Sequence, residues 1–124
     1  MALGDYLDGR REVDPLLEEG PTLRVLRAGV RSLAECLPAA VAARMAAGLP
    51  PVLGREARTA ARQDQGLAGF MDRFVRRSGV RAADALRDVR IVLRILGGLL
   101  PSETMLAVRA SLPEGFEELF RRRS

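Results

Sequence analysis

The chain of 124 residues matches itself when it is shifted by 63 positions, and this internal repeat limits the folds that it can adopt. Residues 23–53 align with residues 86–116 without a gap, and ten of the 31 pairs are identical. Near its end each segment carries a Leu-Pro step, Leu49-Pro50 in the first and Leu112-Pro113 in the second. Such a match predicts a tandem duplication, in which two similar units pack together around a shared core.

Apolar residues in both segments recur at spacings of three and four, which is typical of an amphipathic helix. Pro38 and Pro101 are expected to end these helices and to open the next ones, because proline is tolerated at the first position of a helix. Gly97 and Gly98, late in the second helix, are expected to permit close helix packing or a bend. The two apolar stripes consist of Leu23, Leu26, Val30, Leu33 and Leu37, and of Leu86, Val89, Leu93, Leu96 and Leu100.

The region in front of the second stripe also has a helical pattern, which Gly79 is expected to end. Its counterpart in the first unit, residues 7–17, has a weaker pattern. We therefore expect one all-α domain over residues 1–124, a compact helical bundle of two tandem repeats with about three to four helices each. Repeat one would span about residues 5–57, a linker about residues 58–63, and repeat two about residues 64–121.

The residue types that most enzymes use are missing from this sequence. It contains no His and no Lys, and Cys36 is its one cysteine. Acid–base catalysis near neutral pH most often uses His, and a Cys nucleophile needs a basic partner. One Cys without His also cannot supply the four ligands of a zinc site. We therefore expect no enzymatic activity, no cofactor, no metal and no small-molecule substrate, and we expect Cys36 to be a small buried hydrophobic residue.

All twenty basic residues are Arg, and the formal net charge is +4. Two rows of arginines repeat in register beside the apolar stripes. In one interpretation their stems cover apolar surface and their guanidinium groups pair with acids such as Asp84 or Asp88. In the other interpretation both rows face one groove and bind an anionic partner through the forked guanidinium donors. The rows are Arg24, Arg27 and Arg31 in the first unit and Arg87, Arg90 and Arg94 in the second.

Further positive charge gathers around residues 73–81 and in the C-terminal Arg121–Arg123, and we expect these clusters to be solvated. No segment has the pattern of a signal peptide, and none approaches about 18 apolar residues without a charge. A single cysteine fits a reducing compartment. These features predict a cytoplasmic protein that makes no membrane contact.

The second unit also carries a series of short motifs. They are Phe70 with Arg73, Phe74 and Val75, then Gly79-Val80, then Arg90 with Val92, Leu93 and Leu96, then Arg109-Ala110, Leu112-Pro113, Phe116 and Leu119-Phe120. In this order they resemble the repeat of a bacterial family named domain of unknown function 2267. The resemblance extends over residues 22–120 and leaves out residues 1–20, which do not match the family's leading helix. It implies an all-helical tandem domain and no reaction, because none is assigned to the family.

Together these observations favour a non-enzymatic helical module that binds another protein or itself, since grooves between helices suit partner helices. The first unit is the expected docking side, because its closing segment brings only Val52 and Leu53 to the core. The alternative is a nucleic-acid-binding protein that uses the arginine rows and the basic C-terminal tail. Against this alternative, the sequence has no aromatic platform for single strands and no helix-turn-helix signature.

Overall fold

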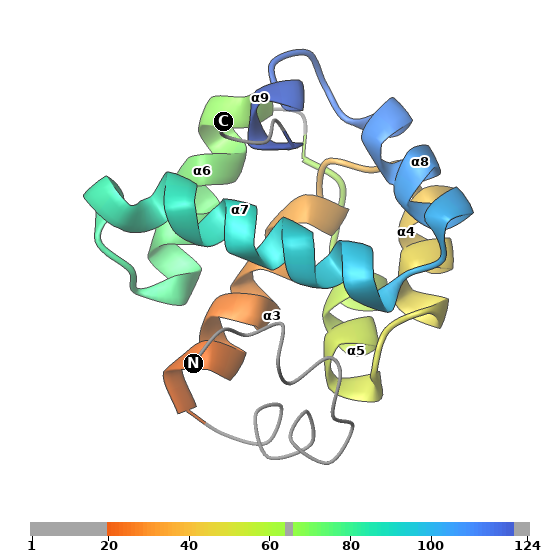
Figure 1. Ribbon diagram of the computed structural model, residues 1–124, viewed down its shortest axis with the longest axis horizontal. Helices are drawn as coiled ribbons and strands as arrows, with labels where there is room; N and C mark the ends of the chain where they lie inside the picture. Colours follow the sequence, from red (N-terminus) through yellow and green to blue (C-terminus); the bar gives the residue numbers. More distant parts are fainter. Residues whose placement is uncertain (1–19, 64–65, 121–124) are drawn as a thin grey trace.

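The computed structural model describes residues 20–63 and 66–120, and all regular secondary structure in these ranges is helical. The prediction of an all-α fold is therefore confirmed for this part of the chain. The described helices, labelled in Figure 1, are α3 (Gly20–Ala34), α4 (Ala39–Ala47), α5 (Pro51–Thr59), α6 (Gly66–Ser78), α7 (Ala82–Leu99), α8 (Ser102–Ser111) and α9 (Glu117–Phe120). The predicted weak helix at residues 7–17 and the basic tail lie outside the described residues.

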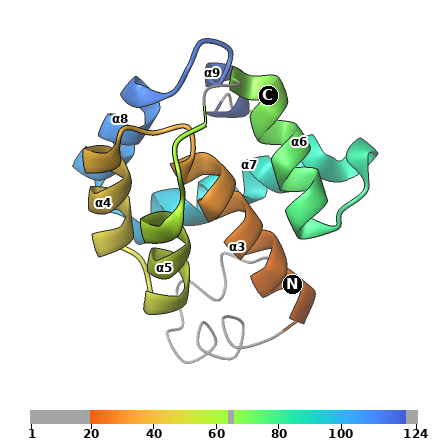
Figure 2. The same ribbon diagram turned by 180° about the vertical axis from the view of Figure 1, so that it is seen from behind.

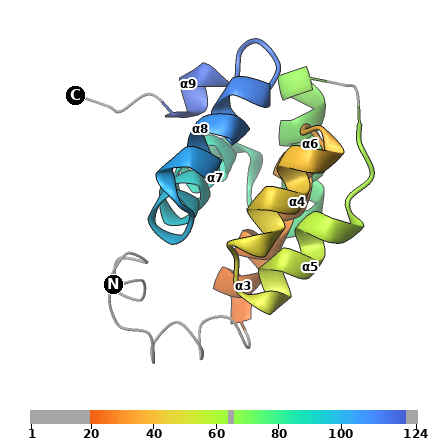
Figure 3. The ribbon, with the colours of Figure 1, turned by 90° about the vertical axis from the view of Figure 1, so that its right-hand side faces the viewer.

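The helices lie in two layers, which Figure 3 shows edge-on. Helices α3, α4, α5 and α6 lie on one side, and α7, α8 and α9 lie on the other. Helix α3 packs most extensively against α6, and it also contacts α5 and α7. Helix α4 packs against α5 and α8. Helix α3 therefore contacts helices of both layers.

Most of the predicted apolar stripes form the core between these layers. In α3, Leu26, Val30 and Leu33 are at most 2% exposed, and Val89 and Leu96 of α7 are equally buried. Such complete burial of aliphatic side chains is the main favourable contribution to folding. The predicted periodicity therefore corresponds to real burial.

Aromatic side chains of the second half complete this core. Phe70, Phe74 and Phe116 are at most 1% exposed, and the rings of Phe70 and Phe116 meet edge to face with centroids 5.2 Å apart. Leu86, the first residue of the second predicted stripe, departs from the pattern because it is 44% exposed. It lies next to Ala85, which is 2% exposed and belongs to the core, so Leu86 falls outside the buried face of α7.

Prolines set three helix boundaries, and the sequence predicted two of them, at Pro38 and Pro101. Pro38, Pro50 and Pro101 are the N-cap residues of α4, α5 and α8. Gly79 follows α6 with φ of +77°, a left-handed conformation that favours glycine. Helix α3 ends earlier than its apolar stripe. The N–H groups of Cys36 and Leu37 donate to carbonyls three residues back, so the chain tightens into a turn before Pro38.

The close packing predicted at Gly97 is wrong. Gly97 and Gly98 are both exposed, and a Cβ atom added to Gly97 would meet nothing within 4 Å. Helices α3 and α7 approach each other closely at Gly29 instead, where an added Cβ would be 2.7 Å from Cγ1 of Val92. Figure 2 shows α3 crossing α7. This crossing leaves no room for a side chain at position 29, so glycine is required there.

Candidate functional site

A polar hollow of about 240 Å³ lies between α3, α5 and α6. Helical spacings of three and four bring the arginines of α3 to one side of their helix, where they line this hollow. We call it the arginine hollow. Its lining residues are Arg24, Arg27, Ala28 and Arg31 of α3, Glu56 of α5 and Arg77 of α6.

Ion pairs fasten the α5 wall of the hollow to α3. The Nε and Nη2 atoms of Arg27 both lie 2.7 Å from Oε2 of Glu56. Arg31 donates from Nη1 to Oε1 of Glu56 at 3.4 Å and to Oγ1 of Thr59 at 3.2 Å. The Glu56 side chain is only 11% exposed, so this carboxylate is held in a fixed position between two guanidinium groups.

On the α6 wall, Arg77 lines the hollow and also pairs with the buried carboxylate of Glu35. It donates from Nη1 and Nη2 to the two carboxylate oxygens of Glu35, each at 2.7 Å, and from Nη1 to Oγ of Ser32 at 3.1 Å. Arg24 donates from Nε to the main-chain carbonyl of Arg77 at 3.4 Å. This two-point pairing fixes the plane of the Arg77 guanidinium.

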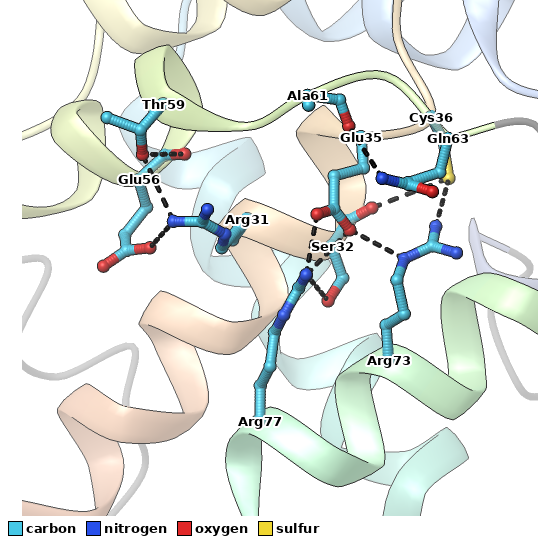
Figure 4. A network of polar contacts seen from close by, with 10 residues as sticks. All are labelled: Arg31, Ser32, Glu35, Cys36, Glu56, Thr59, Ala61, Gln63, Arg73 and Arg77. Atoms are coloured by element: carbon cyan, nitrogen blue, oxygen red, sulfur yellow. Dashed lines mark hydrogen bonds and ion pairs between the residues drawn. The ribbon is translucent and has the colours of Figure 1, made fainter.

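Behind the hollow lies a buried charge cluster, formed by Glu35, Arg73 and Arg77 and drawn in Figure 4. Arg73 donates from Nε to Oε1 of Glu35 at 2.7 Å, and the two side chains are 6% and 3% exposed. The main-chain carbonyl of Glu35 also accepts from the N–H of Gln63, at 2.7 Å. The prediction that residues 73–81 form a solvated face is therefore wrong for Arg73, because α6 turns this side chain into the protein.

Opposing effects set the pKa of the Glu35 carboxyl. Burial raises it, but the hydrogen bonds and charges of Arg77, and then those of Arg73, outweigh burial and hold the pKa below its ordinary value of 4.5. Glu35 is therefore a carboxylate at neutral pH.

Cys36 is 3% exposed, as predicted for a buried hydrophobic residue. Burial raises the pKa of its thiol, so Cys36 is not a reactive thiolate at neutral pH.

The second predicted row lies elsewhere. Arg87 pairs with Asp84 at 3.8 Å and with Asp88 at 3.4 Å on its own helix. Arg90 donates from Nη2 to the main-chain carbonyl of Glu118 at 3.1 Å, and Arg94 is exposed. None of the three arginines of α7 lines the arginine hollow. Of the six predicted arginines, the structure thus brings together the three of α3, which are Arg24, Arg27 and Arg31. Glu56 and Arg77 line the same hollow and were not predicted.

Sequence reasoning missed the four residues that organise this region, although two of them left a signal. Arg73 lies between Phe70 and Phe74 in the apolar stripe of its helix, and Glu35 stands among apolar neighbours. A charge in such a place is buried only when it is paired. The remaining two, Glu56 and Arg77, lie in polar segments where no such contrast exists.

A second, more apolar hollow of about 310 Å³ lies between α8, the segment that follows it, and α9. At its rim Leu106 is 64% exposed, the most exposed large apolar side chain of the described residues. Inside it, the Arg109 guanidinium carbon lies 4.7 Å from the centroid of the Phe120 ring. We call it the α8–α9 groove. It is lined by Leu106, Arg109, Ala110, Leu112, Pro113, Phe116, Glu117 and Phe120.

Two further properties bear on function. Within residues 20–63 and 66–120, no group of three or more metal-ligating side chains could hold an ion. In the same ranges no helix has both the length and the apolar composition to cross a membrane.

These features define a small helical protein with a charged hollow on one side and an apolar groove on another. The model of the family described as "Uncharacterized conserved protein (DUF2267)" matches residues 16–119, so the chain belongs to this family. The family resemblance of the sequence motifs is thereby confirmed. No curated protein and no solved structure matches the chain.

Proposed function

We propose that this protein is a non-enzymatic interaction module whose α8–α9 groove receives an apolar side chain of a helical protein partner. The observation that carries this proposal is the exposure of Leu106, 64%, at the rim of a groove that also contains Leu112 and Phe120. Exposed apolar surface around a concave site is characteristic of protein interaction sites. The volume of about 310 Å³ is at the lower limit for small-molecule sites and suits one or two inserted side chains.

The chemistry of the groove also indicates what kind of residue a partner presents. Arg109 lies across the ring of Phe120, and its guanidinium group is available at the edge of the apolar surface. A partner helix with a large apolar anchor and a carboxylate one turn away would fill the groove and pair with Arg109. Our proposal therefore has the partner dock on the second half of the chain. The first half, which the sequence favoured, buries Leu53 completely.

The absence of His and Lys from the sequence supports a non-enzymatic role, because no ordinary general base for neutral pH is present. The single cysteine supports a cytoplasmic location for the module.

We also propose that the chain arose by tandem duplication. Shifting α4 by 63 positions gives residues 102–110, and α8 is Ser102–Ser111. Shifting α3 gives residues 83–97, which lie within α7. The helices matched in this way also contact each other, α3 with α7 and α4 with α8. Contact between matched elements supports two units that pack face to face.

The interaction is tested with one variant in the groove and one control outside it. Leu106→Asp places a charge at the rim of the groove, and Leu86→Asp makes the same change at the other exposed leucine, on α7. A partner is captured from the source cells by a photo-crosslinking amino acid at position 106, identified, purified and titrated against the wild type and both variants. We expect Leu106→Asp to weaken binding at least tenfold and Leu86→Asp to leave it unchanged.

A second copy of the chain is the other possible occupant, and sedimentation velocity over a range of concentrations tests it. A dimer that Leu106→Asp abolishes would identify the partner as a second copy. A monomer at every concentration that binds no purified protein, or equal weakening by both variants, would contradict the proposal.

Nucleic-acid binding by both arginine rows is a less supported candidate, because Arg87, Arg90 and Arg94 do not line the hollow of the α3 row. A mobility-shift experiment at low salt tests it. Binding that weakens steeply as salt rises would favour it.

A further inference from the structure

We propose that the arginine hollow is a binding site for a phosphate monoester. This site lies between α3, α5 and α6 and shares no residue with the α8–α9 groove, so it does not depend on the proposed docking function. Its four guanidinium groups come from Arg24, Arg27, Arg31 and Arg77. Guanidinium groups present paired N–H donors that match the oxygens of a phosphate group.

Several of these donors have no acceptor among the described residues. Arg24 uses only its Nε, in a hydrogen bond to the Arg77 carbonyl, and both of its terminal nitrogens remain without an acceptor. Arg27 directs Nε and Nη2 to Glu56, which leaves Nη1. The hollow therefore has donors on the α3 side that a bound anion can use.

The charge of the hollow favours a dianion. Four guanidinium groups face one lining carboxylate, Glu56, and one carboxylate behind the wall, Glu35. Because Glu35 is shared with Arg73, five guanidinium groups face two carboxylates, and among the described residues an excess of three positive charges remains. A phosphate monoester carries between one and a half and two negative charges near neutral pH, which offsets at least half of this excess.

The site is also held in place before any ligand arrives. Glu56 fixes Arg27, and Glu35 fixes Arg77, each through contacts of 2.7 Å. The Arg24 guanidinium packs on the turn after α6, where a Cβ added to Gly79 would lie 3.4 Å from its Cζ. Side chains that are already ordered lose little conformational entropy on binding.

The same geometry favours one isolated phosphate over a polyanion. The hollow is about 240 Å³ in volume, and the arginines of α7 do not extend it. A nucleic acid would need a continuous row of basic groups along its backbone. The hollow offers one compact cluster instead.

The experiment is a titration of the full-length, ¹⁵N-labelled chain with inorganic phosphate at constant ionic strength, followed by the NMR signals of the arginine side chains. The test variant is Arg24→Gln, because within residues 20–63 and 66–120 Arg24 pairs with no carboxylate and its loss leaves the ion pairs of these ranges intact. The control is Arg94→Gln, an exposed arginine outside the hollow on α7. We expect saturable shifts of the hollow's arginines, a Kd about tenfold weaker in Arg24→Gln, and no change in Arg94→Gln.

Two further titrations separate the sources of the phosphate group. Glycerol 3-phosphate represents a small metabolite, and a phosphoserine peptide represents a modified protein. If either compound binds more tightly than inorganic phosphate, the result supports the proposal and identifies the kind of molecule that carries the phosphate group. The proposal is overturned by shifts that chloride reproduces at equal ionic strength, or by equal weakening in both variants. Tighter binding of a 12-base-pair duplex that depends equally on Arg24 and Arg94 would overturn it in favour of nucleic acid.

Discussion

At the scale of single residues, the interior of this protein depends on one carboxylate. Glu35 accepts hydrogen bonds from Arg73 and Arg77, and its main-chain carbonyl accepts from Gln63. It therefore joins the end of α3, two turns of α6 and the segment between α5 and α6. Breaking a buried ion pair by removing one partner costs far more than the pair contributes in net stability, because the other charges stay buried.

The first prediction concerns this carboxylate. Replacing Glu35 by Gln removes the carboxylate that pairs with the buried guanidinium of Arg73 at 2.7 Å and should lower the free energy of unfolding at pH 7 by about 3 kcal/mol or more. Its pKa is lower in the folded than in the unfolded chain, so its contribution is complete well above pH 4.5 and is lost as the pH falls through the folded value. Urea unfolding at pH 7 and at successively lower pH should show the difference between wild type and Glu35→Gln shrinking in acid.

Asp72→Asn is the matched control for this prediction. The Asp72–Arg76 pair also joins a carboxylate to an arginine, but it spans 3.7 Å and both side chains are more than two-thirds exposed. Its loss should change stability by less than about 0.5 kcal/mol. If Glu35→Gln were as mild as Asp72→Asn at pH 7, the account of the buried charge cluster would be wrong.

The residues of this cluster were only partly predictable. Arg73 is a charge within an apolar stripe, and that contrast marks it as buried and paired. Its acceptor lies 38 positions earlier in the chain, and no local pattern connects the two. Glu56 raised no expectation, because an acid in a polar helix is ordinarily solvated.

At the scale of elements, periodicity predicted helices, and Pro38 and Pro101 predicted where two of them begin. Both signals act over a few residues, so one sequence is enough to interpret them. The crossing of α3 and α7 depends instead on how closely two distant backbones approach. Gly97 and Gly98 stood out in the sequence as a pair and proved to be exposed. Gly29 stood alone and lies at the contact.

The second prediction compares two Gly→Ala substitutions in helices. Gly29→Ala places a methyl group against Val92 and should lower the free energy of unfolding by about 1–3 kcal/mol through overpacking. Gly97→Ala meets nothing and should raise it by about 0.5–1 kcal/mol, because alanine is the better helix former. Thermal unfolding of both variants followed by circular dichroism checks the opposite signs. A neutral Gly29→Ala would show that α3 and α7 cross at a greater distance.

At the scale of the whole molecule, the two halves of the chain cover each other. Helix α3 of the first half packs most extensively against α6, which belongs to the second half, and it also contacts α7. Part of the apolar stripe of α3 is therefore covered by the other half of the chain. The sequence predicted a shared core, but it did not indicate which helix of one half would cover which helix of the other.

The third prediction follows from this arrangement. Peptides of residues 1–63 and 64–124 should each unfold without a cooperative transition, because Leu26, Val30 and Leu33 of the first lose the side chains that cover them. Mixing the two in equal amounts should restore helical circular dichroism and a single melting transition. As a control, the folded full-length chain is cleaved between residues 60 and 63, and its melting transition is compared with that of the mixed peptides. Independent cooperative folding of either half would contradict the prediction.

Positions 29 and 92, which meet at the crossing of α3 and α7, are 63 residues apart. Under the proposed duplication they are one position in two copies. In a pair of identical subunits, a residue on the twofold axis faces itself, so two valines would collide there and two glycines would leave a void. Once both copies belong to one chain, each can change alone, and glycine can face valine. Under the proposed duplication, the pairing of Gly29 with Val92 is therefore a contact that two identical copies could not make and that two diverged copies can.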